Sequence, residues 1–546
     1  MAEPKRLGLR PVLLVLVIAL AASAAGLPNG FAYDDFPAIV RNADVHTLHA
    51  PWRFWTETYW PLTRFAGGET LYRPLTSLAF AVQWVLGNGS PLPFHLVSTA
   101  LYLAACGVFL WLAWVVLPAE GALAAACLFA AHPVHVEAVG NVVGQSELLA
   151  ALFSLLAVGL LVRVRGPGPI GLGDRLRLYG CYLLACLSKE NGVILPGLLL
   201  AAEFTVVRDP RPLRVRLLAL REFWIVLIGV GLCYVALRAM VIGTLAGDYP
   251  HVLIAHATYP QRIYTMLRVA LEWPRLLLWP AHLQADYSPR DFDLALAFGP
   301  VQFAGVGMLA TSAWLIWWAW RRRPAVAFGV MWFYIAIFLV SNLVFKTGVL
   351  LAERTLLLPS AGVMLALGGA VAAATEVPHR RRWLVAGSAA AFTCLGVLRS
   401  AVRQPVWKDN WALLRATVRD APRNYHAHWS YGLQLFDLGL RESAFTEIET
   451  AIDLYPRDAA LLSDAGDLHR TAGECDEAIA LYRRSLAIDP RRLYTQSRLA
   501  SCYMRVGRYA DARLEIHRLI DQGHPQFVIL LPAIDSASAA GATAFR

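Results

Sequence analysis

Residues 11–36 read PVLLVLVIALAASAAGLPNGFAYDDF, an apolar run followed by two adjacent aspartates, Asp34 and Asp35. An apolar run of this length predicts a helix that spans a membrane. Carboxylates at the edge of a span are costly to dehydrate, so we expect the pair to face a water-filled cavity rather than lipid. The two aspartates are therefore the first candidates for a reaction centre.

The composition predicts that most of the chain lies in a membrane. Of the 546 residues, 57% are hydrophobic and 16% are charged, which is too apolar for a soluble protein. The formal net charge of +10 could indicate nucleic-acid binding. The arginines instead gather in short clusters between apolar runs, as the positive-inside rule predicts for inner loops, at 163–165, 208–221, 321–323 and 380–382. This pattern argues against a nucleic-acid partner.

Residues 1–27 allow two interpretations. The basic residues Lys5, Arg6 and Arg10, the apolar stretch and the small residues Ala22-Ser23-Ala24 resemble a cleavable signal peptide. We favour a retained signal anchor, because the many later spans give a first helix a place in a bundle. Cleavage would also leave the two aspartates almost at the amino terminus.

With the basic clusters placed inside, the pattern predicts an all-α, polytopic membrane domain over residues 1–402. Residues 75–86 are too short to span and should form an interfacial or re-entrant helix. Residues 263–279 have their charges on one side and should lie on the membrane as an amphipathic helix. About eleven crossings are predicted, at 11–27, 94–117, 121–131, 148–162, 176–187, 192–207, 223–242, 301–320, 324–343, 355–374 and 383–399. An odd number puts the carboxy terminus on the outer side, with Asp34.

The carboxy-terminal part carries an internal repeat. Pro422, Pro456 and Pro490 recur at intervals of 34 residues, and Pro525 follows one residue late. This is the period of the tetratricopeptide repeat, in which small residues recur where two helices approach closely. Such residues occupy matching positions: Gly432, Gly466 and Ala500; Ala444, Ala478 and Ala512; and, at the turn between helices, Gly439, Gly473 and Gly507.

We predict an α-solenoid over residues 403–530 and a flexible tail at 531–546. The solenoid begins with a half repeat at 407–422, and three whole repeats follow at 423–456, 457–490 and 491–524. Such an array forms a concave surface that usually binds a peptide or protein. A spacer or dimerisation module is the alternative. In both cases the array is predicted to lie on the same side as the aspartate pair.

Many charged groups of the membrane part fall in predicted outer loops. They are distant in sequence but could converge on one cavity: Asp34, Asp35, Arg73, His132, His135, Glu137, Lys189, Glu190, Lys346, Glu353 and Arg354. Carboxylates beside cations at a membrane surface suit a reaction in which an anionic lipid leaving group departs. A carboxylate would remove a proton from the acceptor.

Five motifs carry a resemblance to a known family. They are FAYDD at 31–35, YRPL at 72–75, HPVHVEAV at 132–139, SKE at 188–190 and ERTLLLPS at 353–360. Followed by tetratricopeptide repeats and in matching order, they resemble the transmembrane and tetratricopeptide-containing protein O-mannosyltransferases. This family belongs to the GT-C superfamily of integral-membrane glycosyltransferases. The resemblance covers nearly the whole chain.

The resemblance implies a polyprenyl- or dolichyl-phosphate sugar donor, with mannose as the expected sugar, and transfer with inversion to a protein Ser or Thr hydroxyl. Asp34 would be the general base, while Asp35 would orient it or share the acceptor contact. Glu137 corresponds to the second-loop acid and would hold the acceptor or a metal ion. Arg354 would stabilise the departing lipid phosphate. Lys189 and Arg73 would assist it.

Several of these residues have other interpretations. Asp34 or Asp35 could cap a helix in the loop. His132 and His135 are three residues apart but lack an evident third metal ligand, so orientation of the loop or contact with the lipid phosphate is favoured. The pairs Lys189 with Glu190 and Glu353 with Arg354 are also compatible with charges that reach the interface. No metal-ligand spacing occurs, and a divalent metal stays possible.

Two other functions are compatible with the same sequence. One is a GT-C enzyme or ligase acting on a glycan or lipid acceptor, and the other is a non-enzymatic, membrane-anchored repeat scaffold. The number of apolar runs argues against the scaffold, since one helix would anchor a repeat domain. We expect a multi-pass protein of a bacterial inner membrane, with the site and the repeats in the periplasm. In a eukaryote the corresponding places are the membrane and lumen of the endoplasmic reticulum.

Overall fold

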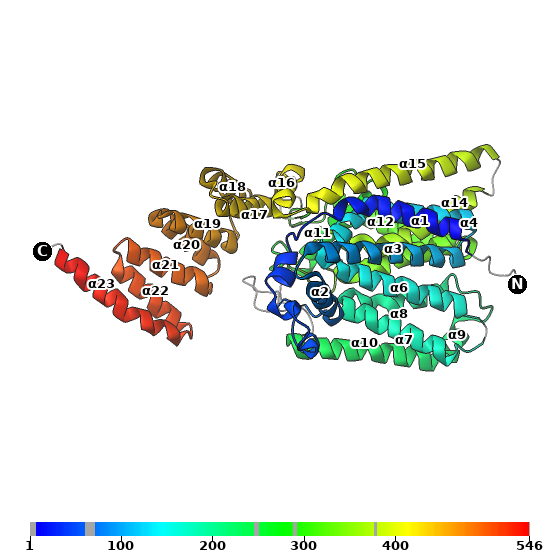
Figure 1. The fold of residues 1–546 in the computed structure, drawn as a ribbon, viewed down its shortest axis with the longest axis horizontal. Helices are drawn as coiled ribbons and strands as arrows, with labels where there is room; N and C mark the ends of the chain where they lie inside the picture. The colour runs from blue at the N-terminus through cyan, green and yellow to red at the C-terminus, as the bar shows by residue number, and fades with distance from the viewer. Residues whose placement is uncertain are drawn as a thin grey trace. The chain divides into compact units, whose positions relative to one another are not determined.

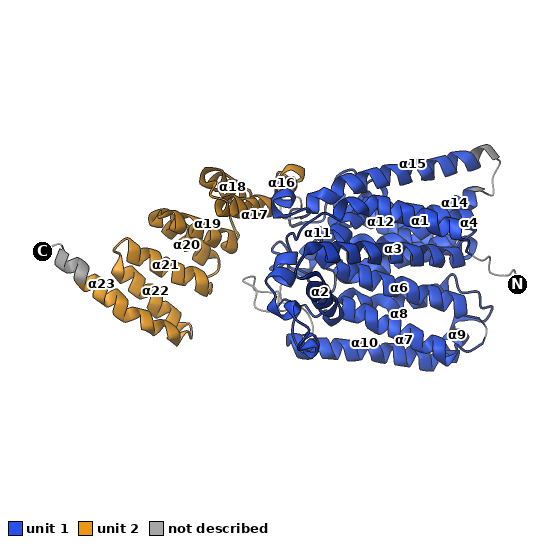
Figure 2. Cartoon of the chain, viewed as in Figure 1, with its two compact units in different colours: residues 1–287, 292–416 blue, residues 288–291, 417–546 orange. Residues whose placement is uncertain are grey.

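The computed structural model describes residues 7–60, 71–166, 168–244, 250–287, 292–375 and 379–544 (Figure 1). Within these ranges the regular structure is helical and no extended strand occurs, which confirms the predicted all-α class. The described chain forms two compact units (Figure 2). Unit 1 comprises residues up to 287 together with 292–416, and unit 2 begins at residue 417.

Unit 1 contains the candidate membrane helices. Seven helical segments of the described chain are long and apolar enough to cross a membrane: Leu9–Gly26, Pro91–Val116, Val142–Val164, Arg221–Ile242, Pro300–Arg322, Glu353–Ala374 and Arg382–Trp407. They correspond to α1 (Leu9–Ser23), α3 (Pro91–Val116), α6 (Gln145–Val164), α10 (Arg221–Ile242), α12 (Pro300–Arg322), α14 (Leu357–Thr375) and α15 (His379–Arg403). An eighth results if two helices bent by 47°, Ala119–Ala130 and Pro133–Gly140, form one broken span.

The predicted count of about eleven crossings is therefore not confirmed. The remaining predicted spans correspond to short helices: α4 (Ala119–Ala130), α7 (Leu172–Ser188), α8 (Leu195–Phe204) and α13 (Pro324–Ile337). An unshielded span needs about 20 residues. A shorter helix satisfies its backbone internally but needs neighbours around its ends.

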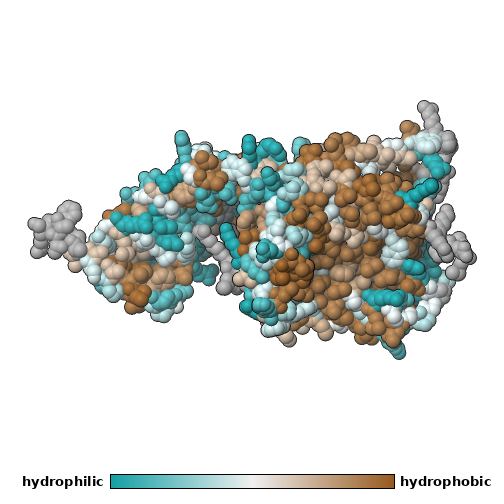
Figure 3. Space-filling model, in the orientation of Figure 1, coloured by the Kyte–Doolittle hydropathy of each residue, from teal (hydrophilic) through white to brown (hydrophobic). Residues whose placement is uncertain are grey.

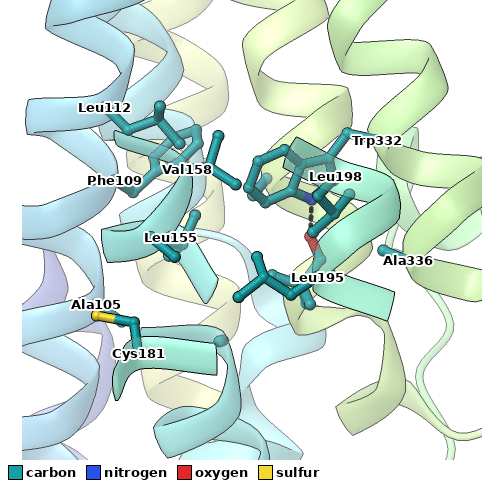
Figure 4. Close-up of a cluster of buried hydrophobic side chains, with 14 of the residues drawn as sticks. Ala105, Phe109, Leu112, Leu155, Val158, Cys181, Leu195, Leu198, Trp332 and Ala336 are labelled. Atoms are coloured by element: carbon teal, nitrogen blue, oxygen red, sulfur yellow. Dashed lines mark hydrogen bonds between the residues drawn. The ribbon is translucent and has the colours of Figure 1, made fainter. Parts of the chain in front are cut away.

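The core of unit 1 supplies such neighbours for α8 and α13. Figure 4 shows Leu195 and Leu198 of α8 beside Trp332 of α13, close to Phe109 of α3 and Leu155 of α6. The buried indole N–H of Trp332 donates to the Leu358 carbonyl oxygen at 2.8 Å. This bond satisfies the polar atom of the largest side chain in the cluster.

Glycines allow α13 and α14 to approach closely. A Cβ built on Gly329 would lie 2.3 Å from the Gly362 carbonyl oxygen, and one on Gly362 would lie 2.4 Å from that of Gly329. Only glycine fits at such a crossing, which is typical of helix packing in membranes. The face of unit 1 that Figure 3 shows is largely apolar. On α10, Ile225 and Leu232 are exposed, as expected of side chains that face lipid.

Two helices agree with the predicted non-spanning segments. α2 (Pro74–Gly87) has 14 residues and covers the predicted interfacial stretch. α11 (Tyr259–Leu278) is amphipathic, and its apolar side packs Val269 and Trp273 into a second core cluster with Phe333 of α13. Whether either helix lies on a membrane surface stays a prediction.

Unit 2 has the predicted repeat architecture. Three helix pairs follow the 34-residue period: α17 (Tyr425–Asp437) with α18 (Arg441–Leu454), α19 (Ala459–Ala472) with α20 (Cys475–Ile488), and α21 (Leu493–Arg505) with α22 (Tyr509–Asp521). Gly439, Gly473 and Gly507 have φ values of +80°, +93° and +78° at the turns, where glycine avoids strain. A Cβ on Gly466 would lie 2.6 Å from the Tyr482 ring, which explains the recurring small residue. The chain enters the repeats through α16 (Asn410–Asp420), and α23 (Leu531–Ala544) follows them.

Candidate active site

The loop after α1 separates the roles of the two adjacent aspartates. Asp35 is fully buried. Its Oδ1 accepts a hydrogen bond from the Val143 N–H at 2.9 Å, and its Oδ2 accepts from Ala32 at 3.1 Å and Val142 at 3.4 Å. Burial raises the pKa of the Asp35 carboxyl to about 7, although the three backbone N–H groups oppose this shift. Asp35 therefore ties the loop to the turn before α6.

Asp34 instead faces a cation. Its Oδ2 lies 3.4 Å from Nη2 of Arg354, and the Asp34 side chain keeps 16% of its surface exposed. Nη1 of Arg354 lies 2.5 Å from Oε1 of Glu137, and the Arg354 backbone N–H donates to Glu137 Oε2 at 2.8 Å. The structure thus brings together three predicted site residues from three segments that are far apart in sequence.

The other two predicted phosphate-binding cations also have carboxylate partners. Arg73, directly before α2, donates from Nε and Nη2 to the two carboxylate oxygens of Glu190 at 3.0 Å and 2.8 Å. Lys189 bonds to Glu147 of α6. Burial by itself would raise the pKa of Glu190, but Arg73 and Lys189 outweigh it and hold that pKa at about 2. The Arg73–Glu190 pair is therefore ionic.

These ion pairs form one electrostatic network. The Glu147 charge acts on both Arg73 and Arg354 as well as on Lys189. The Arg73 guanidinium also lies over the Tyr59 ring, 5.1 Å from its centroid. We call this network the Asp34 cluster, and its members are Asp34, Arg73, Glu137, Glu147, Lys189, Glu190 and Arg354. All of these residues except Glu147 are among the loop charges whose convergence the sequence predicts.

The remaining predicted residues bond to other parts of unit 1. His132 lies 2.9 Å from the Leu277 carbonyl oxygen through Nε2. His135 contacts the Tyr102 hydroxyl at 3.0 Å and the Ser360 hydroxyl at 2.8 Å. Oε1 of Glu353 accepts hydrogen bonds from the Gln284 N–H at 2.6 Å and from a tyrosine hydroxyl, Tyr287, at 2.9 Å. Their burial and hydrogen-bond partners suit side chains that hold loops in place.

The side chains of the described residues do not group as a metal site. Among them, no three His, Cys, Asp or Glu residues lie together as ligands would. Glu137, for which a metal contact was one prediction, uses both carboxylate oxygens on Arg354.

Several residues of the site were missed in the sequence. Glu147 directly precedes an apolar run, as Asp34 directly follows one, so the cost of burying a carboxylate could have identified it. Tyr33 and Asp286 have no such signal. Burial raises the pKa of the Tyr33 hydroxyl, and the charges of Asp286 and Asp34 add to this effect. Asp286 therefore lies near the Asp34 loop.

The structure contains an apolar cavity of about 420 Å³, and two of its lining residues follow Glu190 of the Asp34 cluster within four positions in the sequence. Val193 and Ile194 line it from the short helix Glu190–Ile194, which begins with the partner of Arg73. Tyr334 and Ile335 line it from α13, and Phe338 and Leu339 line it from the turn that follows α13, Phe338–Val340. Its surface suits a hydrocarbon chain.

Comparison with known families identifies the repeats. Two tetratricopeptide repeat models match residues 435–492 and 469–527. The matches confirm the repeat type that the 34-residue period predicts.

Comparison with curated proteins covers the membrane unit as well. The relatives are protein O-mannosyl-transferases. Protein O-mannosyl-transferase F38B6.6 of Caenorhabditis elegans is 26% identical over 82% of this chain and 63% of its own length. Human Protein O-mannosyl-transferase TMTC4 is 27% identical over 79% of this chain and 64% of its own. Tmtc2 of Drosophila melanogaster is 38% identical over 33% of this chain and 20% of its own length. The chain thus spans less than two thirds of the length of these relatives.

Proposed function

We propose that this chain, whose curated relatives are TMTC protein O-mannosyl-transferases, is an inverting membrane glycosyltransferase. It would move a sugar, mannose in the first instance, from a polyprenyl- or dolichyl-phosphate donor to a Ser or Thr hydroxyl of a protein. The observation that carries the proposal is the contact of Arg354 with both Asp34 and Glu137, in a cluster that stays partly open to solvent.

The proposed chemistry needs one base and one group that stabilises an anion. Asp34 takes the proton from the acceptor hydroxyl as the hydroxyl oxygen attacks C1 of the sugar. The bond from C1 to the phosphate oxygen breaks, and its electron pair leaves on the lipid phosphate. Attack opposite the leaving group inverts the configuration at C1. Arg354, next to the base, offsets the charge that develops on the phosphate.

The cluster also suits the donor's mixed character. Arg73 and Lys189 supply further positive charge, and the apolar cavity that begins at Val193 has the lining expected for part of an isoprenoid chain. In the structure each cation is neutralised by a carboxylate, so phosphate binding requires that a cation share or exchange its partner. Glu190 is the most exposed of these partners, at 30% of its side chain, and is the first expected to move.

The repeat unit would present the acceptor. Tetratricopeptide arrays bind peptides and proteins on their concave surface, and the relatives are named for a protein acceptor. We place the site and the repeats in the periplasm of a bacterial inner-membrane protein. The lumen of the endoplasmic reticulum is the corresponding compartment in a eukaryote.

A donor panel tests the proposal. Purified protein is incubated with several polyprenyl-phosphate sugars and a Ser/Thr-containing acceptor, and release of the lipid phosphate is measured. Asp34→Asn should reduce release by about 100-fold or more, because the base is lost. Asp44→Asn is the matched control, since Asp44 lies in the same loop and pairs with a partly exposed arginine, Arg53, at 2.7 Å. Full release by Asp34→Asn would refute the assignment of the base.

A further inference from the structure

Residues 404–413, which we call the strap, lead from α15 into α16 and hold the loop that carries Asp34. The Asn29 side chain donates to the Gln404 carbonyl oxygen at 3.0 Å, and the Gly30 N–H donates to that of Lys408 at 2.7 Å. The Tyr33 N–H donates to Oδ1 of Asn410 at 2.6 Å. Three hydrogen bonds therefore join two segments almost 400 residues apart in sequence.

Apolar packing seats the strap on the same loop. Trp407 and Leu413 form a buried cluster with Ala32, which precedes Tyr33, and with Val136, which precedes Glu137. The approach is close, because a Cβ built on Gly140 would lie 3.2 Å from Cβ of Trp407. The strap thus contacts the segments that carry both acids bound to Arg354.

Tyr33 has an unusual backbone conformation at this contact. Its φ is +51°, in the left-handed region that bulky side chains rarely adopt. Such a conformation persists only where surrounding contacts enforce it, and it is often found next to functional residues. The hydrogen bond from the Tyr33 N–H to Asn410 is such a contact, and Asp34 is the next residue.

We propose that Asn410 is a positioning residue for Asp34. By accepting the Tyr33 N–H, it selects the left-handed conformer and so directs the following carboxylate towards Arg354 and the acceptor. This role rests on the proposed function, because it acts through the proposed base. It adds a requirement that the transfer chemistry alone does not include: an oxygen acceptor at position 410, in the helix that leads into the repeats.

A separate hydrogen bond fixes the backbone next to Asn410. Asp409 Oδ1 accepts the Ala412 N–H at 2.8 Å and caps the start of α16, so the backbone beside Asn410 is fixed by a separate bond. Removing the Asn410 side chain therefore leaves the helix cap and the packing of Trp407 in place. The expected defect is misdirection of Asp34 rather than unfolding of the strap.

Variants at position 410 test the inference. Asn410→Ala removes the acceptor, and kcat for transfer should fall by about tenfold or more because small misplacements of a catalytic group are costly. KM for donor and acceptor should stay within about twofold, since Asn410 is proposed to act through the Tyr33 N–H and not through either substrate. Asn410→Asp keeps an oxygen acceptor and should retain most of the activity.

The control is Asn42→Ala, which removes a local bond from the Asp44 N–H to Asn42 Oδ1 in the same loop, together with the bond that the Asn42 amide donates to the Ala38 carbonyl oxygen. Its kcat should remain close to that of the wild type. Thermal unfolding measures the folded fraction, and kcat is expressed per folded molecule. Asn410→Leu, which fills the space of the amide, replaces the alanine variant if the latter does not fold.

Two results would overturn the positioning role. One is wild-type kcat in a variant without an acceptor at position 410, and the other is an Asp variant as impaired as the Ala variant. If Asp34→Asn itself retained full activity, the proposed function would fail first, which distinguishes the two failures.

Discussion

Unit 1 contains two buried ionic networks that differ in their access to solvent. In the first, the Asp34 cluster, Asp34 and Arg354 keep 16% and 20% of their side chains exposed. In the second, Arg165 at the end of α6 lies 2.5 Å from Oε1 of Glu203 and 3.0 Å from Oδ2 of Asp209. These three side chains are 0% exposed, and Asp209 also pairs with Arg211, which lies at the edge of the network and keeps 32% of its side chain exposed.

The difference separates a structural network from a candidate site. A sealed ion pair holds the segments that carry it and is costly to break, because one charge is left buried without its partner. A partly open pair can exchange its partner for a charged substrate. Both networks are rich in arginine and carboxylate, so composition does not distinguish them. Exposure does.

The largest predicted effect comes from removing one arginine from each network. Arg354→Gln should lower the transfer rate by about 100-fold or more, because the leaving phosphate loses its counter-charge. Arg165→Gln should cost about 3–5 kcal/mol of stability but leave the rate per folded molecule unchanged. The measurements are single-turnover transfer and thermal unfolding in detergent. A catalytic defect in Arg165→Gln at full stability would remove the distinction between the networks.

A smaller effect is expected at the edge of the open network. Arg73→Lys keeps the charge but loses the two-pronged geometry that now binds Glu190. We expect KM for the donor to rise by about tenfold with little change in kcat. Arg53→Lys, in a partly exposed pair with Asp44, is the control. Steady-state kinetics with varied donor would show the shift, and an unchanged KM would place Arg73 outside donor binding.

Asp35 gives a pH-dependent prediction. Its pKa is about 7 in the folded protein and 3.8 ordinarily, so the folded state holds this proton more tightly than the unfolded state. The resulting stabilisation is complete below about pH 4 and is lost as the pH rises towards 7. Asp35→Asn cannot titrate, so the Tm of the wild type relative to this variant should fall between about pH 4 and pH 7 and change little above that. A constant difference would contradict the raised pKa.

The smallest predicted effect lies in unit 2. It concerns the packing of two helices rather than an ionic network. Gly466→Ala places a Cβ 2.6 Å from the Tyr482 ring and should destabilise the repeats by about 1–3 kcal/mol. Gly180→Ala in α7 is the control, since a Cβ there meets no atom within 4 Å. Circular dichroism during heating would report both. Equal melting curves would show that the repeat positions tolerate larger residues.

The sequence predicted the two units unequally well. The repeats of unit 2 are recognisable from their 34-residue period, because each repeat needs a small residue such as Gly466 at the same helix contact. The number of spans stays unconfirmed, since an apolar run such as the one that forms α8 predicts a crossing but gives a helix of only 10 residues. The convergence of Asp34, Glu137 and Arg354 followed from assigning their loops to one side. The partner of each cation did not, because pairing depends on tertiary packing.

The division of labour between Asp34 and Asp35 shows the same limit. Sequence places both at the edge of a span and makes them equivalent. Only the fold gives Asp35 three backbone donors and leaves Asp34 beside Arg354. The role of Tyr33 is likewise invisible in sequence, because a left-handed tyrosine carries no compositional signal.

The most direct test of the central claim follows the sugar. Purified protein is given polyprenyl-phosphate mannose and a Ser/Thr-containing peptide, and mass spectrometry measures hexose on the peptide hydroxyl alongside released lipid phosphate. We predict that both products form in equal amounts with the wild type and with Asp44→Asn, and that neither forms with Asp34→Asn. Hexose found on a glycan or lipid and absent from peptide, or equal transfer by Asp34→Asn, would contradict the account.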